Sequence, residues 1–361
     1  MGDIMKKSLK VGYIGAGANT EKHHIPKIQV QEGVEAFGVA NRSIESSKRV
    51  AEKFGIKNVY PNWKELLKDS EIDAVCIGTW PYMHAPLTIE ALNSGKHVLV
   101  EARMAMNSEE ALEMENISKK NPQLITQVVP APHTLPYDLT IIDWINEEMG
   151  DLLFLDMRIT TGEFPNLKSE MHWRNNRDLS GNNIMHMGIW YEAAMRWLGT
   201  ASSVNASAQT VVNRMKTGKI FREVTIPDHL EVMGSMSVGG KYHFTHSNVL
   251  GGGPIADVWI YGTKGTLHLY DNQTSSEVSS DNSFSMALEI TKPDSNIKWE
   301  KLNIKPENIG SWRVEEEFVN AIRGKEHISH TSFKDGVKYM EFTDAVRKSW
   351  ESASEIKLPL R

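Results

Sequence analysis

A glycine turn near the N-terminus is the first segment whose residue types and spacing could do chemistry. Apolar residues 9–14 run into Gly15-Ala16-Gly17. In a strand–turn–helix unit, the first glycine permits the tight turn and the second lets the backbone approach a pyrophosphate, which then faces the free N–H groups of the next helix. Thr20 stands where a third glycine is usual, and its hydroxyl could bond a phosphate oxygen. The pattern predicts a dinucleotide site, to which we assign Gly15, Gly17, Ala18, Asn19 and Thr20.

The end of the second predicted strand selects the form of the cofactor. Residues 34–40 run into Asn41-Arg42-Ser43. An NAD site usually has an acidic residue here that accepts the ribose hydroxyls. Asn41 removes the carboxylate that would repel a 2′-phosphate, while Arg42 and Ser43 offer donors that suit one. These residues predict NADP as the cofactor; the alternative is NAD, with Arg42 as a solvated turn residue.

Alternating strands and helices would position these residues. Through residue 130, short apolar runs alternate with amphipathic stretches that begin at capping residues such as Ser43 and Asn107. This alternation predicts a parallel sheet with right-handed crossovers. After about residue 150, long β-type runs joined by tight turns predict an open, mostly antiparallel sheet. We therefore predict an α/β protein with a doubly wound cofactor domain over residues 1–130 and an α+β domain for substrate binding and oligomerisation over 131–361. An alternative for the last helices is that they pack back on the first domain.

The composition argues against several classes of protein. Forty basic and 46 acidic residues give a net charge of −6, which argues against a nucleic-acid partner. The sequence contains no run of about 18 apolar residues, the length that a membrane span needs. The polar N-terminus does not resemble a signal peptide. Cys76 is the single cysteine, so no internal disulfide can form, and potential ligands do not recur at metal-binding spacing. We expect a cytoplasmic protein without a metal.

Several sequence blocks occur in the order typical of one enzyme family. The blocks are residues 73–84, 95–101, 173–181, 261–266 and 316–350. With them the chain resembles the Gfo/Idh/MocA family, which includes glucose–fructose oxidoreductase and inositol dehydrogenase. The resemblance implies a Rossmann domain plus a C-terminal sheet whose open face forms a homodimer or homotetramer. It also implies hydride exchange between NAD(P) and a carbohydrate-like substrate that is bound between the domains.

The same resemblance adds residues to the cofactor site. We expect Glu101, at the end of a predicted strand, to lie beside the nicotinamide, because ligands bind at the carboxyl ends of such strands. His84 would fix a loop rather than react. His23 and His24 are interpreted as surface residues at a helix start. The added cofactor-binding residues are Thr79, Trp80, Pro81, His84 and Glu101.

The catalytic positions depart from the family pattern. The usual E-K-P reads Glu101-Ala102-Arg103, so the lysine that bonds the reacting oxygen is absent. Arg103 could bind or polarise the substrate, but it cannot donate a proton of matched pKa. In the usual D-x-G-x-H-x-x-D helix, His186 replaces the first aspartate, Trp190 replaces the histidine, and an alanine replaces the last aspartate.

Two interpretations of this helix remain open. In the first, His186 has taken over acid–base work, Trp190 forms an apolar wall or stacks on a sugar, and Tyr191 is an alternative hydroxyl donor. In the second, the acid–base apparatus is lost and these side chains pack in the core. Further candidates for substrate binding are His133, His172, Trp173 and Arg174.

Three functions are compatible with these residues. The leading hypothesis is an NAD(P)-dependent dehydrogenase or reductase that acts on a CH–OH group of a sugar, polyol or glycoside. The first alternative is a redox-neutral enzyme that uses transient oxidation to drive elimination or glycoside cleavage. The second alternative is a non-catalytic dinucleotide-binding protein, which the loss of the usual lysine and histidine favours.

Overall fold

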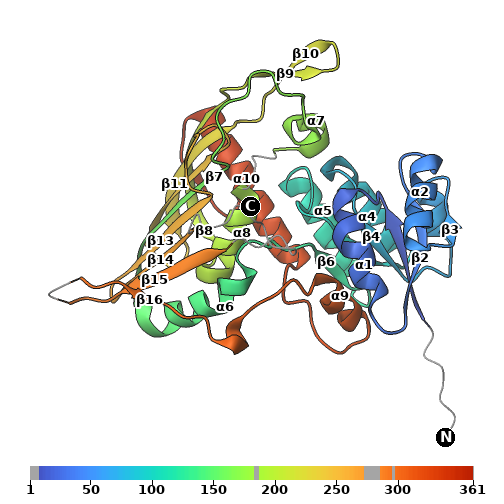
Figure 1. Cartoon of the computed structure of the whole chain (residues 1–361), viewed down its shortest axis with the longest axis horizontal. Helices are drawn as coiled ribbons and strands as arrows, with labels where there is room; N and C mark the ends of the chain where they lie inside the picture. The colour runs from blue at the N-terminus through green and yellow to red at the C-terminus, as the bar shows by residue number, and fades with distance from the viewer. Residues whose placement is uncertain (1–7, 183–186, 272–284, 295–296, 361) are drawn as a thin grey trace, which may run out of the picture. The chain divides into compact units, whose positions relative to one another are not determined.

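The chain forms two compact units, each with its own sheet (Figure 1). The computed structural model describes residues 8–182, 187–271, 285–294 and 297–360. The first unit comprises the residues up to Pro130 together with Arg313–Val337. The second comprises Ala131–Trp312 and the segment from Lys338 onward. No helix of the described ranges is long and apolar enough to cross a membrane.

The first unit is built on a six-stranded parallel sheet. The strands are β1 (Leu9–Ile14), β2 (Val34–Ala40), β3 (Asn58–Val59), β4 (Ala74–Ile77), β5 (His97–Val100) and β6 (Thr126–Val128). Their order, β3-β2-β1-β4-β5-β6, reverses direction between β1 and β4. Open sheets of this kind bind ligands at such a reversal, beyond the carboxyl ends of the strands. The predicted parallel sheet is confirmed.

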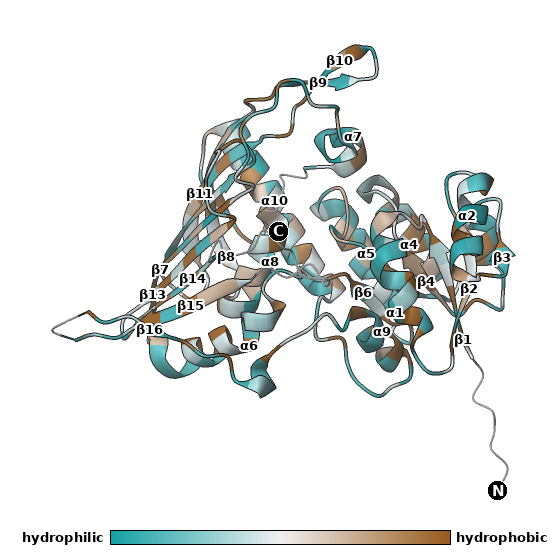
Figure 2. Ribbon diagram, viewed as in Figure 1, coloured by the Kyte–Doolittle hydropathy of each residue, from teal (hydrophilic) through white to brown (hydrophobic). Residues whose placement is uncertain are grey.

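Local sequence signals place the helices of this unit. Ser43 caps α2 (Ile44–Phe54) by accepting a hydrogen bond from Ser46 N–H, and Asn107 caps α5 (Ser108–Lys120) in the same way. Figure 2 shows both polar and apolar residues along α2, as expected for a helix that packs one face on a sheet. The other helices are α1 (Ile25–Gln29), α3 (Trp63–Lys68), α4 (His84–Asn93) and α9 (Val314–Ile322).

The second unit contains an open nine-stranded sheet. Its order is β16-β15-β14-β13-β7-β12-β11-β8-β17, and among these described strands only the β7–β12 pair is parallel. The mostly antiparallel sheet was predicted and is confirmed. The strands are β7 (Leu152–Thr160), β8 (Ala201–Gln209), β11 (His229–Met236), β12 (Lys241–Ser247), β13 (Ala256–Gly262), β14 (Thr266–Asp271), β15 (Met286–Thr291), β16 (Glu300–Lys301) and β17 (Ile356–Lys357).

Helices cover one face of this sheet. Figure 1 shows α6 (Leu135–Trp144) and α8 (Met187–Leu198) on that face, together with α10 (Phe333–Ser352), whose first residues belong to the first unit. Tyr191 of α8 stacks on Phe342 of α10 with ring centroids 3.6 Å apart, and Phe342 contacts Phe244 of β12 at 6.2 Å. These aromatic contacts form the centre of the core of the second unit.

Candidate active site

The glycine turn lies at the carboxyl end of β1, where the strand order reverses. Gly15 has a φ of +76°, and a Cβ on it would lie 2.4 Å from Thr79 Cγ2, so only glycine fits. Gly17, Ala18 and Asn19 are exposed, and a Cβ on Gly17 would have only one neighbour, 3.9 Å away. The Thr79 hydroxyl is buried without a bonding partner among the described residues. Open backbone and an unused hydroxyl fit a bound dinucleotide.

Thr20 plays a different part from the one that was predicted. Its side chain is buried, with 1% of its surface exposed. A Cβ on Gly78, just after β4, would lie 2.0 Å from Thr20 Oγ1. A third glycine in the turn usually permits the close approach of the helix to the neighbouring strand. Here Gly78, after β4, permits it instead. The Thr20 hydroxyl packs inward against Gly78.

Asn41 holds the glycine turn in place. Its Oδ1 accepts a hydrogen bond from Ala16 N–H at 2.6 Å, and its Nδ2 donates to Ser46 Oγ at 2.9 Å. Ser43 uses its hydroxyl as the cap of α2. Two of the three residues that we assigned to cofactor selection therefore have structural duties at this edge of the sheet.

Arg42 lies between these two residues in the chain. It is exposed, and its guanidinium lies 5.8 Å from the centre of the Trp80 ring. Trp80 is half-buried, and Pro81 is buried at the start of the next loop. A guanidinium beside an aromatic face, at the end of β2, suits the adenosine part of a bound dinucleotide.

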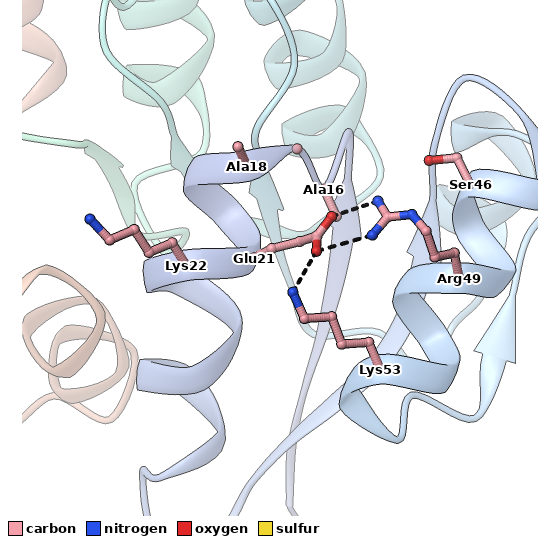
Figure 3. A pocket seen from close by; sticks show the side chains of 8 residues that line it. Ala16, Ala18, Glu21, Lys22, Ser46, Arg49 and Lys53 are labelled. Carbon is pink, nitrogen blue, oxygen red and sulfur yellow. Dashed lines mark hydrogen bonds and ion pairs between the residues drawn. The ribbon is translucent and has the colours of Figure 1, made fainter.

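A pocket adjoins the turn, and Figure 3 shows the side chains that line it. Glu21 points from the helical turn after the glycines toward Arg49 and Lys53 on α2, at distances of 2.6 and 2.9 Å. The hydrogen bond from Arg49 lowers the pKa of the Glu21 carboxyl. Sequence reasoning missed this ion-pair cluster, since its members are far apart in the chain. The lining residues are Ala16, Gly17, Ala18, Glu21, Lys22, Ser46, Arg49 and Lys53.

His84 and Arg103 connect two loops at the carboxyl ends of β4 and β5. His84 is fully buried, with Nδ1 2.8 Å from the Arg103 carbonyl and Nε2 2.9 Å from the Thr79 carbonyl. Burial lowers the pKa of His84, and a neutral imidazole donates to only one of these carbonyls. His84 therefore fixes the loops, and it does not face a ligand as a cofactor contact would. Arg103, which was assigned to catalysis, is also buried, with 7% exposed.

Glu101 belongs to a buried charge cluster that the sequence did not reveal. Its Oε1 lies 2.9 Å from His24 Nε2 and also accepts a hydrogen bond from Asn19 Nδ2. His24 Nδ1 lies 2.6 Å from Glu315 Oε1, on α9. His23 and His24 are 2% and 0% exposed, so their interpretation as surface residues was wrong. Their segment, Thr20–His24, is a π-helical turn, whose buried face a helical period of 3.6 does not predict.

The catalytic helix of the family pattern presents buried aromatic side chains in this chain. Trp190 is 1% exposed and stacks on His133 with ring centroids 5.8 Å apart, so it is not an open wall for a sugar. Tyr191 is equally buried, and its hydroxyl accepts a hydrogen bond from Ala201 N–H at 2.9 Å. Burial raises the pKa of Tyr191. Tyr191 is therefore a core residue rather than a hydroxyl donor to substrate.

Three predicted substrate residues lie together on a loop of the second unit. His172 Nδ1 accepts a hydrogen bond from Arg174 N–H at 3.3 Å, and the Arg174 guanidinium lies 4.4 Å from the centre of the Trp173 ring. Ser180 anchors this loop by donating to the Arg174 carbonyl at 3.0 Å. His172 and Arg174 are exposed. Partial burial and the charge of Arg174 lower the pKa of His172.

His186, the proposed acid–base residue, lies outside the described residues. Within the described ranges, no group of three or more His, Cys, Asp or Glu residues could hold a metal ion.

Comparison with known proteins shows that models of one family match most of the chain. A model for the NAD-binding Rossmann fold of the Gfo/Idh/MocA oxidoreductases matches residues 9–128, and a model for the family's C-terminal domain matches residues 141–268. An uncharacterized oxidoreductase of Synechocystis is 25% identical over 73% of this chain and 71% of its own length. For two further relatives, the match spans little more than half of their length, 57%.

Solved structures share the fold over nearly the whole chain. An NAD-binding oxidoreductase from Klebsiella pneumoniae superposes with a TM-score of 0.82 at 20% identity, covering 97% of this chain and 99% of that one. A levoglucosan dehydrogenase in complex with NADH and L-sorbose has a TM-score of 0.81 at 20% identity, with 99% and 100% covered.

Proposed function

Because this chain belongs to the Gfo/Idh/MocA family of oxidoreductases, we propose that it exchanges a hydride between NADP and a hydroxyl or carbonyl group of a sugar, polyol or glycoside. The observation that carries the proposal is the open glycine turn with the exposed Arg42 beside it. The levoglucosan dehydrogenase that shares this fold supports a carbohydrate-like substrate. The cofactor supplies the hydride chemistry, so the protein needs to bind, orient and move one proton.

Each part of the reaction then has a proposed residue. The backbone of Gly17 and Ala18 receives the pyrophosphate, and Arg42 binds the 2′-phosphate. The exposed His172 and Arg174 bind substrate hydroxyls. His186 carries the proton, since Ala102 has replaced the usual lysine and an imidazole titrates near neutral pH.

The experiment compares NADPH and NADH in fluorescence titrations of the protein and two variants. Arg42→Ala should weaken NADPH binding by about tenfold and NADH binding much less, because only NADPH has the 2′-phosphate. Lys57→Ala is the matched control. Lys57 is 82% exposed, precedes β3 and pairs with Glu35 near the start of β2, so its loss should change neither affinity.

Equal losses of both cofactors in Arg42→Ala would show that Arg42 does not select NADP. If neither cofactor binds to the unmodified protein, the proposed function itself is wrong. A panel of sugars and polyols, followed at the nicotinamide absorbance, then tests the reaction. The burial of Trp190 and Tyr191 favours the alternative of a non-catalytic dinucleotide-binding protein. Mass analysis of the products distinguishes that alternative from a redox-neutral enzyme, because only the enzyme forms a product.

We also propose a homodimer or homotetramer formed through the uncovered face of the nine-stranded sheet. Trp259 of β13 stacks on His268 of β14 at 3.6 Å, and Tyr270 and Trp299 extend this cluster. The neighbours of Trp259, His268 and Tyr270 along β13 and β14 point into the core, so these three rings lie on the opposite face. An aromatic patch of this kind is typical of protein interfaces.

A further inference from the structure

Three ionisable side chains from distant segments meet inside the first unit. His24 ends the turn after the glycines, Glu101 follows β5, and Glu315 lies in the first turn of α9. The imidazole contacts one carboxylate with each ring nitrogen, at 2.9 Å for Glu101 and 2.6 Å for Glu315. The side chains are 0%, 14% and 1% exposed, in the order His24, Glu101, Glu315. Glu101 is thus the end of the triad that reaches the surface.

The two carboxylates keep the imidazole charged. Burial works against a charged histidine, but the hydrogen bonds to Glu101 and Glu315 outweigh it and raise the pKa of His24 to about 10. Burial likewise works against the Glu101 carboxylate, and the bond from His24 lowers the pKa of Glu101. Around neutral pH the triad therefore consists of a cation between two anions.

Four further titratable groups near the triad stay uncharged around neutral pH, and the lysines Lys22 and Lys27, which act on His23, stay charged. Burial raises the pKa of Tyr13 on β1 and of Cys76 on β4. Burial lowers the pKa of His84 on α4 and of His23 beside the triad. Among these groups, His24 is therefore the one whose charge changes just above neutral pH when a carboxylate partner is removed.

The two oxygens of the Glu101 carboxylate accept hydrogen bonds from different partners. Oε1 is used by His24 and Asn19, while Oε2 accepts only the Ala102 N–H, at 3.2 Å, among the described residues. A carboxylate oxygen can accept two hydrogen bonds, so Oε2 keeps a free position at the carboxyl end of β5. Asn19 also ties this carboxylate to the start of the helix that follows the glycine turn.

We propose that His24 and Glu315 are positioning residues for the cofactor: Glu315 keeps His24 charged, and His24 holds Glu101 so that Oε2 can accept a hydroxyl of the bound dinucleotide. This inference rests on the proposed function. The acid on α9 does not itself touch the cofactor in this arrangement. It acts through a histidine, in the way that outer partners orient the ligands of other sites.

The test is the pH dependence of NADPH binding in the variant Glu315→Gln, which keeps the shape of the side chain and removes its charge. Fluorescence titrations from about pH 7 to about pH 9.5 span the range in which a less stabilised imidazole loses its proton. Affinity in the unmodified protein should stay constant across this range. In Glu315→Gln it should fall by about fivefold or more as the pH rises, because His24 then releases Glu101.

Glu317→Gln is the matched control. Glu317 lies on the same helix, is 5% exposed, and binds Gln127 Nε2 at 2.6 Å and Ser329 N–H at 2.8 Å, with no part in the triad. Its loss should leave the pH profile flat. If NADPH affinity falls equally with rising pH in both variants, the effect comes from lost packing, and the proposal is overturned.

The remaining outcomes separate this inference from the proposed function. A flat profile in Glu315→Gln, with normal NADPH binding, would overturn the positioning role alone. Absence of binding in the unmodified protein would overturn both. If Glu315→Gln does not fold, nitrogen-15 NMR of His24 in the unmodified protein decides: an imidazole still charged above pH 9 supports the proposal, and one that titrates near 6.5 overturns it.

Discussion

At the scale of single residues, burial separates side chains that can react from those that cannot. Inside the second unit, the Tyr191 hydroxyl accepts a hydrogen bond from Ala201 N–H, and its ring stacks on Phe342. Trp190 is also enclosed. With Ala102 in place of the usual lysine, these observations leave His186 as the proposed proton carrier of the family's catalytic helix.

Paired substitutions, one at His186 and one at Tyr191 of α8, test that assignment. His186→Ala is expected to lower kcat by about 100-fold, the usual contribution of a general acid or base, without changing NADPH affinity. Tyr191→Phe, the control, should leave kcat unchanged and lower the free energy of unfolding by about 1 kcal/mol, because Ala201 N–H loses its acceptor. Steady-state kinetics and urea unfolding measure the two effects. A loss of kcat in Tyr191→Phe instead would make its hydroxyl catalytic.

At the scale of elements, the geometry of the glycine turn depends on one amide after β2. Asn41→Ala removes the bonds to Ala16 and Ser46, so the turn is no longer held against α2. We expect NADPH and NADH affinities to fall together, by about tenfold, in contrast to the selective loss in Arg42→Ala. Asn58→Ala, which removes a bond to the Phe37 carbonyl away from the turn, is the control. Calorimetric titration measures both affinities. If Asn41→Ala weakens the binding of NADPH alone, Asn41 does not act by holding the glycine turn.

The success of sequence reasoning also differs between elements. Strands, caps and the glycine turn could be predicted, because hydrophobic period and capping chemistry are local properties. The inward direction of Thr20 could not, since it depends on Gly78 in another strand. The partnership of His24 with Glu315 spans 291 residues, and an acid in the first turn of α9 is equally well explained by the helix dipole.

At the scale of the whole molecule, the uncovered face of the large sheet sets the expected assembly. Trp259→Glu places a charge in the aromatic patch, and burying that charge at an interface is costly. We expect the oligomer to dissociate to monomers in analytical ultracentrifugation. Val30→Glu, at a residue 79% exposed in the first unit, should leave the mass unchanged. Unchanged mass in Trp259→Glu would place the interface elsewhere.

The first unit is assembled from two stretches of chain that enclose most of the second in sequence. During synthesis, Glu101 leaves the ribosome roughly 200 residues before Glu315, a delay of about 10 to 40 s at ordinary elongation rates. Throughout that interval His24 has one of its two acids and α9 is missing from the fold. The first unit therefore matures only after most of the second has been translated, although most of its own residues come before the second in the chain.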